Sequence, residues 1–94
     1  MRNDENKSVR AFRMGMDCRP DWFMDEVTAN KVITYAKNKS DGPFEFMETY
    51  ADIITENGII RANYGDYIIK VRGRMHVLDP ARLIFKKARK DINL

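Results

Sequence analysis

Glycine-marked turns between β-branched segments are the feature of this sequence that most constrains its fold. Gly65, before Asp66, supplies a backbone position that tolerates positive φ, and residues 67–71 that follow are a β-branched and aromatic run of strand length. Gly73 then interrupts the run before a second short apolar stretch at 75–78. The pattern predicts a strand entered through a turn and paired with the next strand as a hairpin.

A second hairpin is predicted immediately upstream. Residues 52–55 and 59–62 are both rich in isoleucine and are separated by Glu56-Asn57-Gly58. Asn-Gly between two β-branched runs is the strongest short-range signal for a β-hairpin. The stretch from residue 52 to residue 78 is therefore predicted to be a series of antiparallel strands.

Two segments of the chain resemble a family of small phage and prophage proteins. That family carries a Gly-Asp-(Tyr/Trp)-Ile-Ile-Lys-Gly-Val-Lys-Gly-Glu strand pair, and some members carry Pro-Asp-Trp-Phe-Met near the N-terminus. The resemblance covers residues 8 to 88 and implies a phage setting and a compact fold, without implying a reaction. The matching residues are Pro20, Asp21, Trp22, Phe23 and Met24, then Gly65, Asp66, Tyr67, Ile68, Ile69, Lys70, Val71, Gly73 and Pro80.

The sequence departs from the family pattern at its C-terminal end. The glycine that family members carry after the lysine is missing between Lys70 and Val71, and Arg74 stands where they have glutamate. Family members also carry a cysteine in the turn that follows the strand pair, and this chain has none there. An end that is acidic in the family is basic in this chain. The resemblance therefore leaves open whether this chain binds the same partner as other members.

The rest of the chain completes an expected α+β domain. Residues 8–14 alternate as a strand does, a short helix is expected from Pro20 to about residue 30, and a second strand at 31–35. The polar stretch 37–43, which contains Gly42 and Pro43, is predicted to be a loop. Residues 44–50 fit a helix and a strand equally well.

The C-terminal segment is predicted to be an amphipathic helix. Asp79 suits its N-cap and Pro80 its first position. The fold class expected is a single small α+β domain spanning 1–94, with 1–7 disordered. It would hold a mainly antiparallel sheet of about five or six short strands, a short helix in the N-terminal half and this C-terminal helix. The apolar stripe that would pack on the sheet comprises Ala81, Ile84, Phe85, Ala88 and Ile92.

Composition narrows the class of protein. The 94 residues suffice for one domain, and 33% charged with 44% hydrophobic residues is typical of a globular chain. No apolar run reaches the roughly 20 residues needed to span a bilayer, so a cytoplasmic location is expected, in an infected bacterial host if the phage resemblance holds. The single Cys18 permits no intrachain disulfide and is read as a small apolar residue.

Charge is distributed unevenly along a chain whose net charge is +3. Basic residues of the 67–78 hairpin and of the C-terminal segment are predicted to form an anion-binding surface, with nearby aromatic side chains as stacking contacts. The alternatives are an ordinary solvated charged face and aromatic residues that cover the core. The hypothesis names Lys70, Arg72, Arg74, Arg82, Lys86 and Arg89 as basic residues and Trp22, Tyr64 and Tyr67 as aromatic residues.

No catalytic, metal or cofactor motif is recognisable. His76 has no second ligand at a useful spacing, and no Ser-His, Cys-His or paired-carboxylate arrangement is apparent. The leading hypothesis is a non-enzymatic phage protein for host takeover or counter-defence, which binds a host protein or sequesters a nucleotide-like anion stoichiometrically. The alternative is a nucleic-acid-binding accessory protein that uses the basic helix and hairpin. No membrane partner is expected, and exposed sheet edges favour a homo-oligomer.

Overall fold

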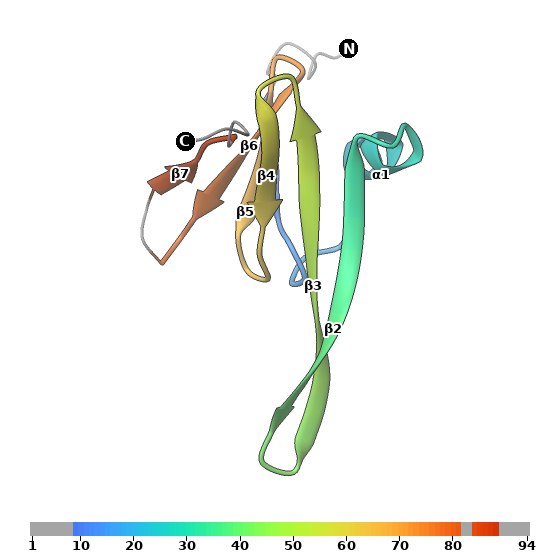
Figure 1. The fold of residues 1–94 in the computed structure, drawn as a ribbon, viewed down its shortest axis with the longest axis vertical. Helices are drawn as coiled ribbons and strands as arrows, with labels where there is room; N and C mark the ends of the chain where they lie inside the picture. Colours follow the sequence, from blue (N-terminus) through green and yellow to red (C-terminus); the bar gives the residue numbers. More distant parts are fainter. Residues whose placement is uncertain (1–8, 82–83, 89–94) are drawn as a thin grey trace.

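The computed structural model describes residues 9–81 and 84–88, which form two antiparallel sheets and one short helix (Figure 1). The four-stranded sheet has the order β1-β5-β6-β7, and the three-stranded sheet has the order β2-β3-β4. The elements are β1 (Val9–Arg13), α1 (Asp21–Thr28), β2 (Val32–Asp41), β3 (Phe44–Thr55), β4 (Gly58–Ala62), β5 (Tyr67–Val71), β6 (Arg74–Asp79) and β7 (Ile84–Lys86).

Both hairpins predicted from the glycine pattern are confirmed. β3 and β4 pair up to Thr55 opposite Gly58, on either side of a two-residue turn. β5 and β6 pair up to Val71 opposite Arg74. The intervening Arg72 and Gly73 both have positive φ, 53° and 82°, as a type I′ turn requires.

The core lies between the inner faces of the two sheets. Side chains alternate between the two faces of a strand, so each sheet contributes every second residue. Phe23 from α1 and Met14, just after β1, complete the core, and both are fully buried. The buried strand residues are Phe12, Ile68 and Val77 from the four-stranded sheet and Val32, Ala51, Ile53, Ile60 and Ala62 from the three-stranded sheet.

Helix α1 is short because its sequence ends it after two turns. Pro20 occupies the N-cap position, and beyond Thr28 the chain turns through Asn30, whose φ is +64°. The backbone N–H of Lys31 donates to the carbonyl oxygen of Glu26 at 2.9 Å, which satisfies one of the last carbonyls of the helix. The helix predicted in this region is confirmed, and it lies beside the start of β2 (Figure 1).

The Gly65-Asp66 turn joins three parts of the chain. Gly65 donates its backbone N–H to Met14 at 2.7 Å, and the carbonyl of Asp66 accepts from the N–H of Met14 at 2.8 Å. The buried carboxylate of Asp66 accepts hydrogen bonds from the backbone N–H of Asn63 and from the ammonium of Lys86. The Gly65-Asp66 turn, which lies in one of the segments that resemble the phage proteins, therefore has a structural role.

The predicted C-terminal amphipathic helix is wrong. Ile84–Lys86 form β7, which pairs with β6, and Phe85 is 60% exposed instead of packing on the sheet. Asp79 accepts a hydrogen bond from the backbone N–H of Ala81, but the turn that it stabilises is not continued as a helix at β7. The part of that helix beyond residue 88, including Ile92, lies outside the described residues, as do residues 1–7.

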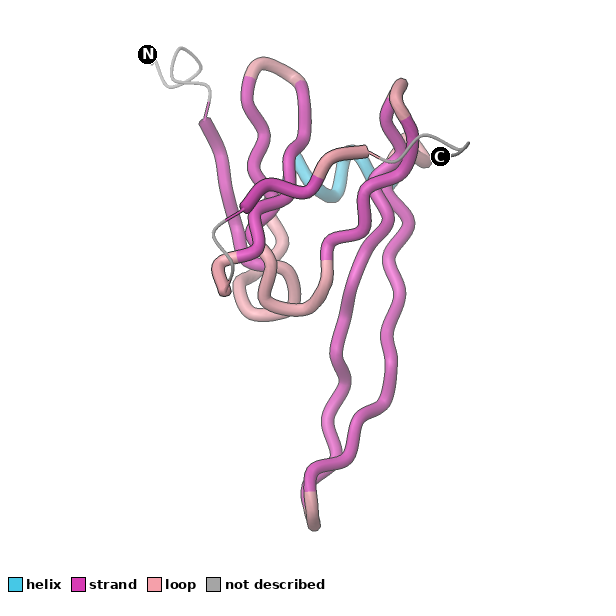
Figure 2. Tube along the Cα trace, turned by 60° about the vertical axis from the view of Figure 1, so that its left-hand side comes forward, coloured by secondary structure: helices cyan, strands magenta, loops and turns pink. Residues whose placement is uncertain are grey.

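The predicted loop at 37–43 is also wrong. β2 continues to Asp41, and the turn consists only of Gly42 and Pro43, because Asp41 pairs with Phe44. Residues 44–50, whose sequence fits a helix and a strand equally well, are part of strand β3. Two long strands therefore form a hairpin that projects beyond the rest of the molecule (Figure 2). We call its projecting part, residues 37–48, the arm.

Candidate functional site

The face of the three-stranded sheet that points away from the core carries an unusual set of exposed side chains. We call it the outer face. Strand alternation assigns its members: near the body their sequence neighbours are the buried core residues of the same strands, and the same alternation continues along the arm. The outer face comprises Ile33, Tyr35, Lys37, Lys39 and Asp41 on β2, Phe44, Phe46, Glu48, Tyr50, Asp52 and Ile54 on β3, and Ile59 and Arg61 on β4.

Two tyrosines and an arginine occupy the middle of the outer face. Tyr35 and Tyr50 are directly opposite each other on β2 and β3, and their rings stack with centroids 5.0 Å apart. The guanidinium carbon of Arg61 lies 4.7 Å from the centroid of Tyr50 and 5.8 Å from that of Tyr35. Tyrosine and arginine are the residue types enriched in the energetic centres of protein interfaces.

Arg61 is held in place by a carboxylate on the neighbouring strand. Its guanidinium donates two hydrogen bonds to the two oxygens of Asp52, one through Nε and one through Nη2 at 3.1 Å. The first of these bonds raises the pKa of Arg61 above its ordinary value, an effect that partial burial opposes. The guanidinium therefore keeps its positive charge, and half of its side chain remains exposed.

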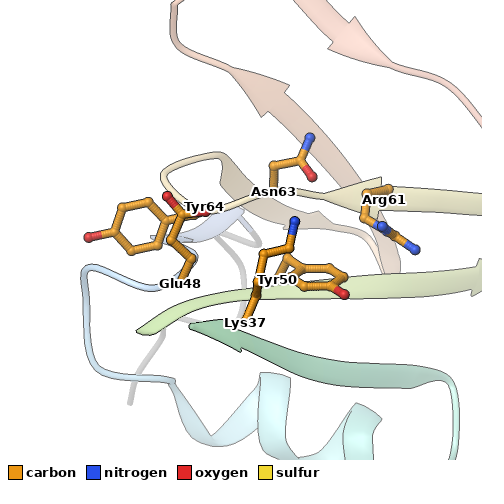
Figure 3. A pocket seen from close by; sticks show the side chains of 6 residues that line it. All are labelled: Lys37, Glu48, Tyr50, Arg61, Asn63 and Tyr64. Atoms are coloured by element: carbon orange, nitrogen blue, oxygen red, sulfur yellow. The ribbon is translucent and has the colours of Figure 1, made fainter. Parts of the chain in front are cut away.

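A shallow hollow of about 230 Å³ lies beside this group (Figure 3). It forms where β4 has ended and the following Asn63 and Tyr64 run alongside β3. Tyr64 packs closely over Gly15: a Cβ at Gly15 would lie 2.4 Å from the Cδ1 of Tyr64, so only glycine fits there. The hollow is lined by Lys37, Glu48, Tyr50, Arg61, Asn63 and Tyr64.

Apolar side chains are exposed at both ends of the outer face. Ile33, Ile54 and Ile59 lie where the sheet joins the body, and each is exposed by more than two fifths. Phe46 and Phe44 lie on the arm, and Phe44 beside the turn is 69% exposed. Scattered exposed apolar residues are normal, but a row of them on one sheet face is typical of an interaction surface.

Four of the six predicted anion-binding residues lie in the part of the chain that the structure describes, and two of these four are paired with carboxylates. Lys70 is bonded to Glu26 at 2.9 Å and Lys86 is bonded to Asp66, so both ammonium groups already have carboxylate partners. Arg72 and Arg74 are exposed at the β5–β6 turn. Arg82 and Arg89 lie outside the described residues.

The three predicted aromatic contacts are in three different settings. Trp22 is partly buried against Phe12, with ring centroids 5.7 Å apart and an edge-to-face geometry, so it belongs to the core margin. Tyr67 lies on β5 under the guanidinium of Arg13, whose carbon is 5.2 Å from the ring centroid. Of the three, Tyr64 alone lines the hollow.

Sequence reasoning did not identify the outer face. The signal was present, because every second residue from Phe44 to Ile54 belongs to that face, but Met47 and Ile53 at odd positions are also apolar and blur the alternation. The prediction of a loop at 37–43 also removed half of the partner strand. A two-residue turn placed at Gly42-Pro43 would have predicted a hairpin in which Tyr35 lies opposite Tyr50.

The described residues form neither a metal-binding cluster nor a membrane-spanning helix. Among residues 9–81 and 84–88, no group of three or more His, Cys, Asp or Glu side chains is arranged to hold a metal ion. Within that same part of the chain, no helix combines the length and apolar character needed to cross a membrane. No protein family, curated protein or solved structure matches the chain.

Proposed function

We propose that this chain is a non-enzymatic binding protein that recognises a protein partner through the outer face of its three-stranded sheet. The observation that carries the proposal is the row of exposed aromatic and aliphatic side chains along the projecting β2–β3 hairpin. Every residue from Lys37 to Met47 is exposed, so the arm contributes nothing to the core that would explain its length. Phe44 and Phe46 on it would gain apolar burial only from a second molecule.

The charges of the outer face support a protein partner better than a polyanion. Three cations, Lys37, Lys39 and Arg61, are balanced by three carboxylates, Asp41, Glu48 and Asp52. A surface for nucleic acid would carry an excess of positive charge. An interspersed set of both signs around aromatic residues is instead typical of a protein interface.

The small size of the hollow favours recognition of a protein partner over binding of a small molecule. Ligand sites generally enclose about 300–1,000 Å³ and bury most of a small molecule. The hollow at Tyr50 is smaller, about 230 Å³, and is open to solvent (Figure 3). The hollow is suited to accept one side chain of a partner, between Lys37 and Tyr64.

The resemblance to phage and prophage proteins supplies the proposed setting. In that setting the chain acts in the cytoplasm of an infected bacterium, and the partner is a host protein bound stoichiometrically for host takeover or counter-defence. The exposed phenylalanines define where the contact should be, whichever host protein is involved.

Site-specific photo-cross-linking in host cells would test the proposal. A benzophenone amino acid replaces Phe46 on the outer face or, as a matched control, Met47, which is also exposed but on the opposite face of the arm. We expect one host protein to be cross-linked in stoichiometric yield from position 46 and not from position 47. The purified partner should then bind the wild type and Met47→Ser with similar affinity and Phe46→Ser at least about tenfold more weakly.

Equal cross-linking from both positions, or unchanged affinity of Phe46→Ser, would contradict this use of the outer face. A partner found only as nucleic acid would replace the proposal with the second candidate below.

Binding of a nucleic acid is a second candidate, favoured by the β5–β6 turn. Arg72 and Arg74 are exposed there, and within residues 9–81 and 84–88 neither forms an ion pair. Exchange of both for glutamate should abolish binding to a fluorescent oligonucleotide, and wild-type affinity should fall steeply with salt. Salt-independent or unaltered binding would exclude this candidate.

A further inference from the structure

We propose that the outer face of the three-stranded sheet, including the arm, is covered by a second copy of this chain, with the two arms antiparallel. The inference rests on the proposed function in one respect: both assign the same face to a protein partner. The second copy would hold the apolar residues out of water until a different partner displaces it. The order of apolar and charged residues along the face supports this antiparallel arrangement.

The outer face consists of six successive rows of residues that lie opposite one another across the strands. From the body to the tip, each row is named by its β3 residue: Ile54, Asp52, Tyr50, Glu48, Phe46 and Phe44. A two-fold axis perpendicular to the strands, between the Tyr50 and Glu48 rows, exchanges the first row with the sixth, the second with the fifth and the third with the fourth. The pattern must be self-complementary under this exchange for two copies to fit.

The apolar ends of the face are complementary under this exchange. Phe44 at the tip of one arm is placed against Ile54 of the second copy. Phe46 comes to the row of the second copy that contains Ile33, whose cross-strand partner is Asp52. Phe44 therefore faces Ile54 directly, whereas Phe46 faces the row of Asp52 with Ile33 as its diagonal neighbour, and these apolar groups lose water.

The charged residues are complementary as well. Lys39 shares its row with Phe46, so the exchange brings its ammonium to the row of Asp52 in the second copy. Lys37 comes to the row of the Tyr35–Tyr50 stack, where its ammonium can lie over a tyrosine ring. Lys39 thus meets the row of the Asp52–Arg61 ion pair, and Asp41 meets the row of Ile54 and Ile59, so no two rows that carry a net charge of the same sign face each other.

The shape of the hairpin is compatible with such contact. Figure 1 shows that β2 and β3 coil about each other towards the tip. Sheets that twist with the same hand pack face to face, with strands inclined by roughly 30°. A face about 40 Å long and 10–14 Å wide offers roughly 400–600 Å² per copy, which is at the low end for a stable complex. The dimer should therefore be weak and reversible.

Sedimentation equilibrium of the purified full-length chain over a wide concentration range tests the association itself. We expect a reversible monomer–dimer equilibrium whose dissociation constant is raised by roughly tenfold or more in Phe46→Ser and is unchanged in Met47→Ser. Circular dichroism of both variants would verify that they are folded. A monomer at every concentration, or equal effects of the two variants, would overturn the proposal, whereas the cross-linking test of the proposed function would be unaffected.

Cysteine pairing tests the antiparallel arrangement. In a Cys18→Ser background, chains with Phe44→Cys are mixed with chains with Ile54→Cys and oxidised mildly. The mixed covalent dimer should form, because the two positions face each other and replacing both large side chains with cysteine lets the sheets approach to the roughly 4 Å between β-carbons that a disulfide requires. Phe44→Cys alone should give no covalent dimer, since its two copies would be roughly 34 Å apart.

Met47→Cys mixed with Ile54→Cys is the matched control and should give no covalent dimer, because residue 47 is on the opposite face. Cross-linking of Phe44→Cys to itself would show parallel arms and overturn the arrangement. Absence of the mixed product from a solution that sedimentation shows to be dimeric would place the contact elsewhere and would also overturn it.

Discussion

The body and the arm of this protein are built from similar strands but are stabilised in different ways. In the body, neighbouring strands bury residues such as Ile53, Ile68 and Val77, all of them without exposed surface. In the arm, β2 and β3 share backbone hydrogen bonds and cross-strand contacts, but no residue from 37 to 47 is buried. The difference indicates that the body determines stability, whereas the arm is available for a partner.

The largest effect should come from a charge placed in the centre of the body. Ile68→Asp puts a carboxylate in the core opposite Phe12 and Val77, and should cost more than about 4 kcal/mol, enough to unfold much of the protein. Thermal unfolding followed by circular dichroism measures this. Met47→Asp makes the same chemical change on the arm, and a normal melting curve is expected. A normal curve for Ile68→Asp would refute the core assignment.

Removal of a buried carboxylate should have the next largest effect. Asp66→Ala leaves the N–H of Asn63 and the half-buried ammonium of Lys86 without their acceptor, at a cost of about 2–4 kcal/mol. Urea titration would measure the loss. Asp41→Ala, at the tip of the arm, should alter the free energy of unfolding by less than about 0.5 kcal/mol. Equal losses would mean that Asp66 contributes no more than an exposed carboxylate.

Two glycines with positive φ offer a closer comparison. Gly15 has φ +84° and is covered by Tyr64, whereas Gly42 has φ +65° and a Cβ added to it would meet no atom within 4 Å. Gly42→Ala should cost about 1 kcal/mol from backbone strain, and Gly15→Ala about 2–3 kcal/mol because Tyr64 must also move. Urea titrations of both variants give the difference. If the two losses were the same, Tyr64 would not pack as described.

The smallest effect on stability should come from the removal of most of the arm. Replacing residues 38–47 with Asn-Gly, so that Lys37 and Glu48 flank a two-residue turn, removes most of the arm. In dilute solution the free energy of unfolding should fall by less than about 1 kcal/mol, since no core residue is lost. Calorimetry of the shortened chain provides the test. Failure of that chain to fold would show that the arm is part of the folding unit.

Local sequence was sufficient for the β3–β4 and β5–β6 hairpins. Asn57-Gly58 and Gly73 located both hairpins, because turn geometry depends on residues next to each other in the chain. The short helix was found in the same way, since Asn30 and the residues before it end it locally. The basic residues were correctly seen as numerous, but their carboxylate partners could not be found without the fold: Lys70 pairs with Glu26, 44 residues away.

The sequence by itself determined the β3–β4 and β5–β6 hairpins and the helix. Only the tertiary structure decided the C-terminal segment and the arm. Residues 84–86 have helix-compatible composition, but pairing with β6 and the bond from Lys86 to Asp66, 20 residues away, favour a strand. The polar residues 37–41 become a strand because β3 supplies hydrogen-bond partners along their whole length. Both outcomes depend on contacts with distant residues, which local propensity does not register.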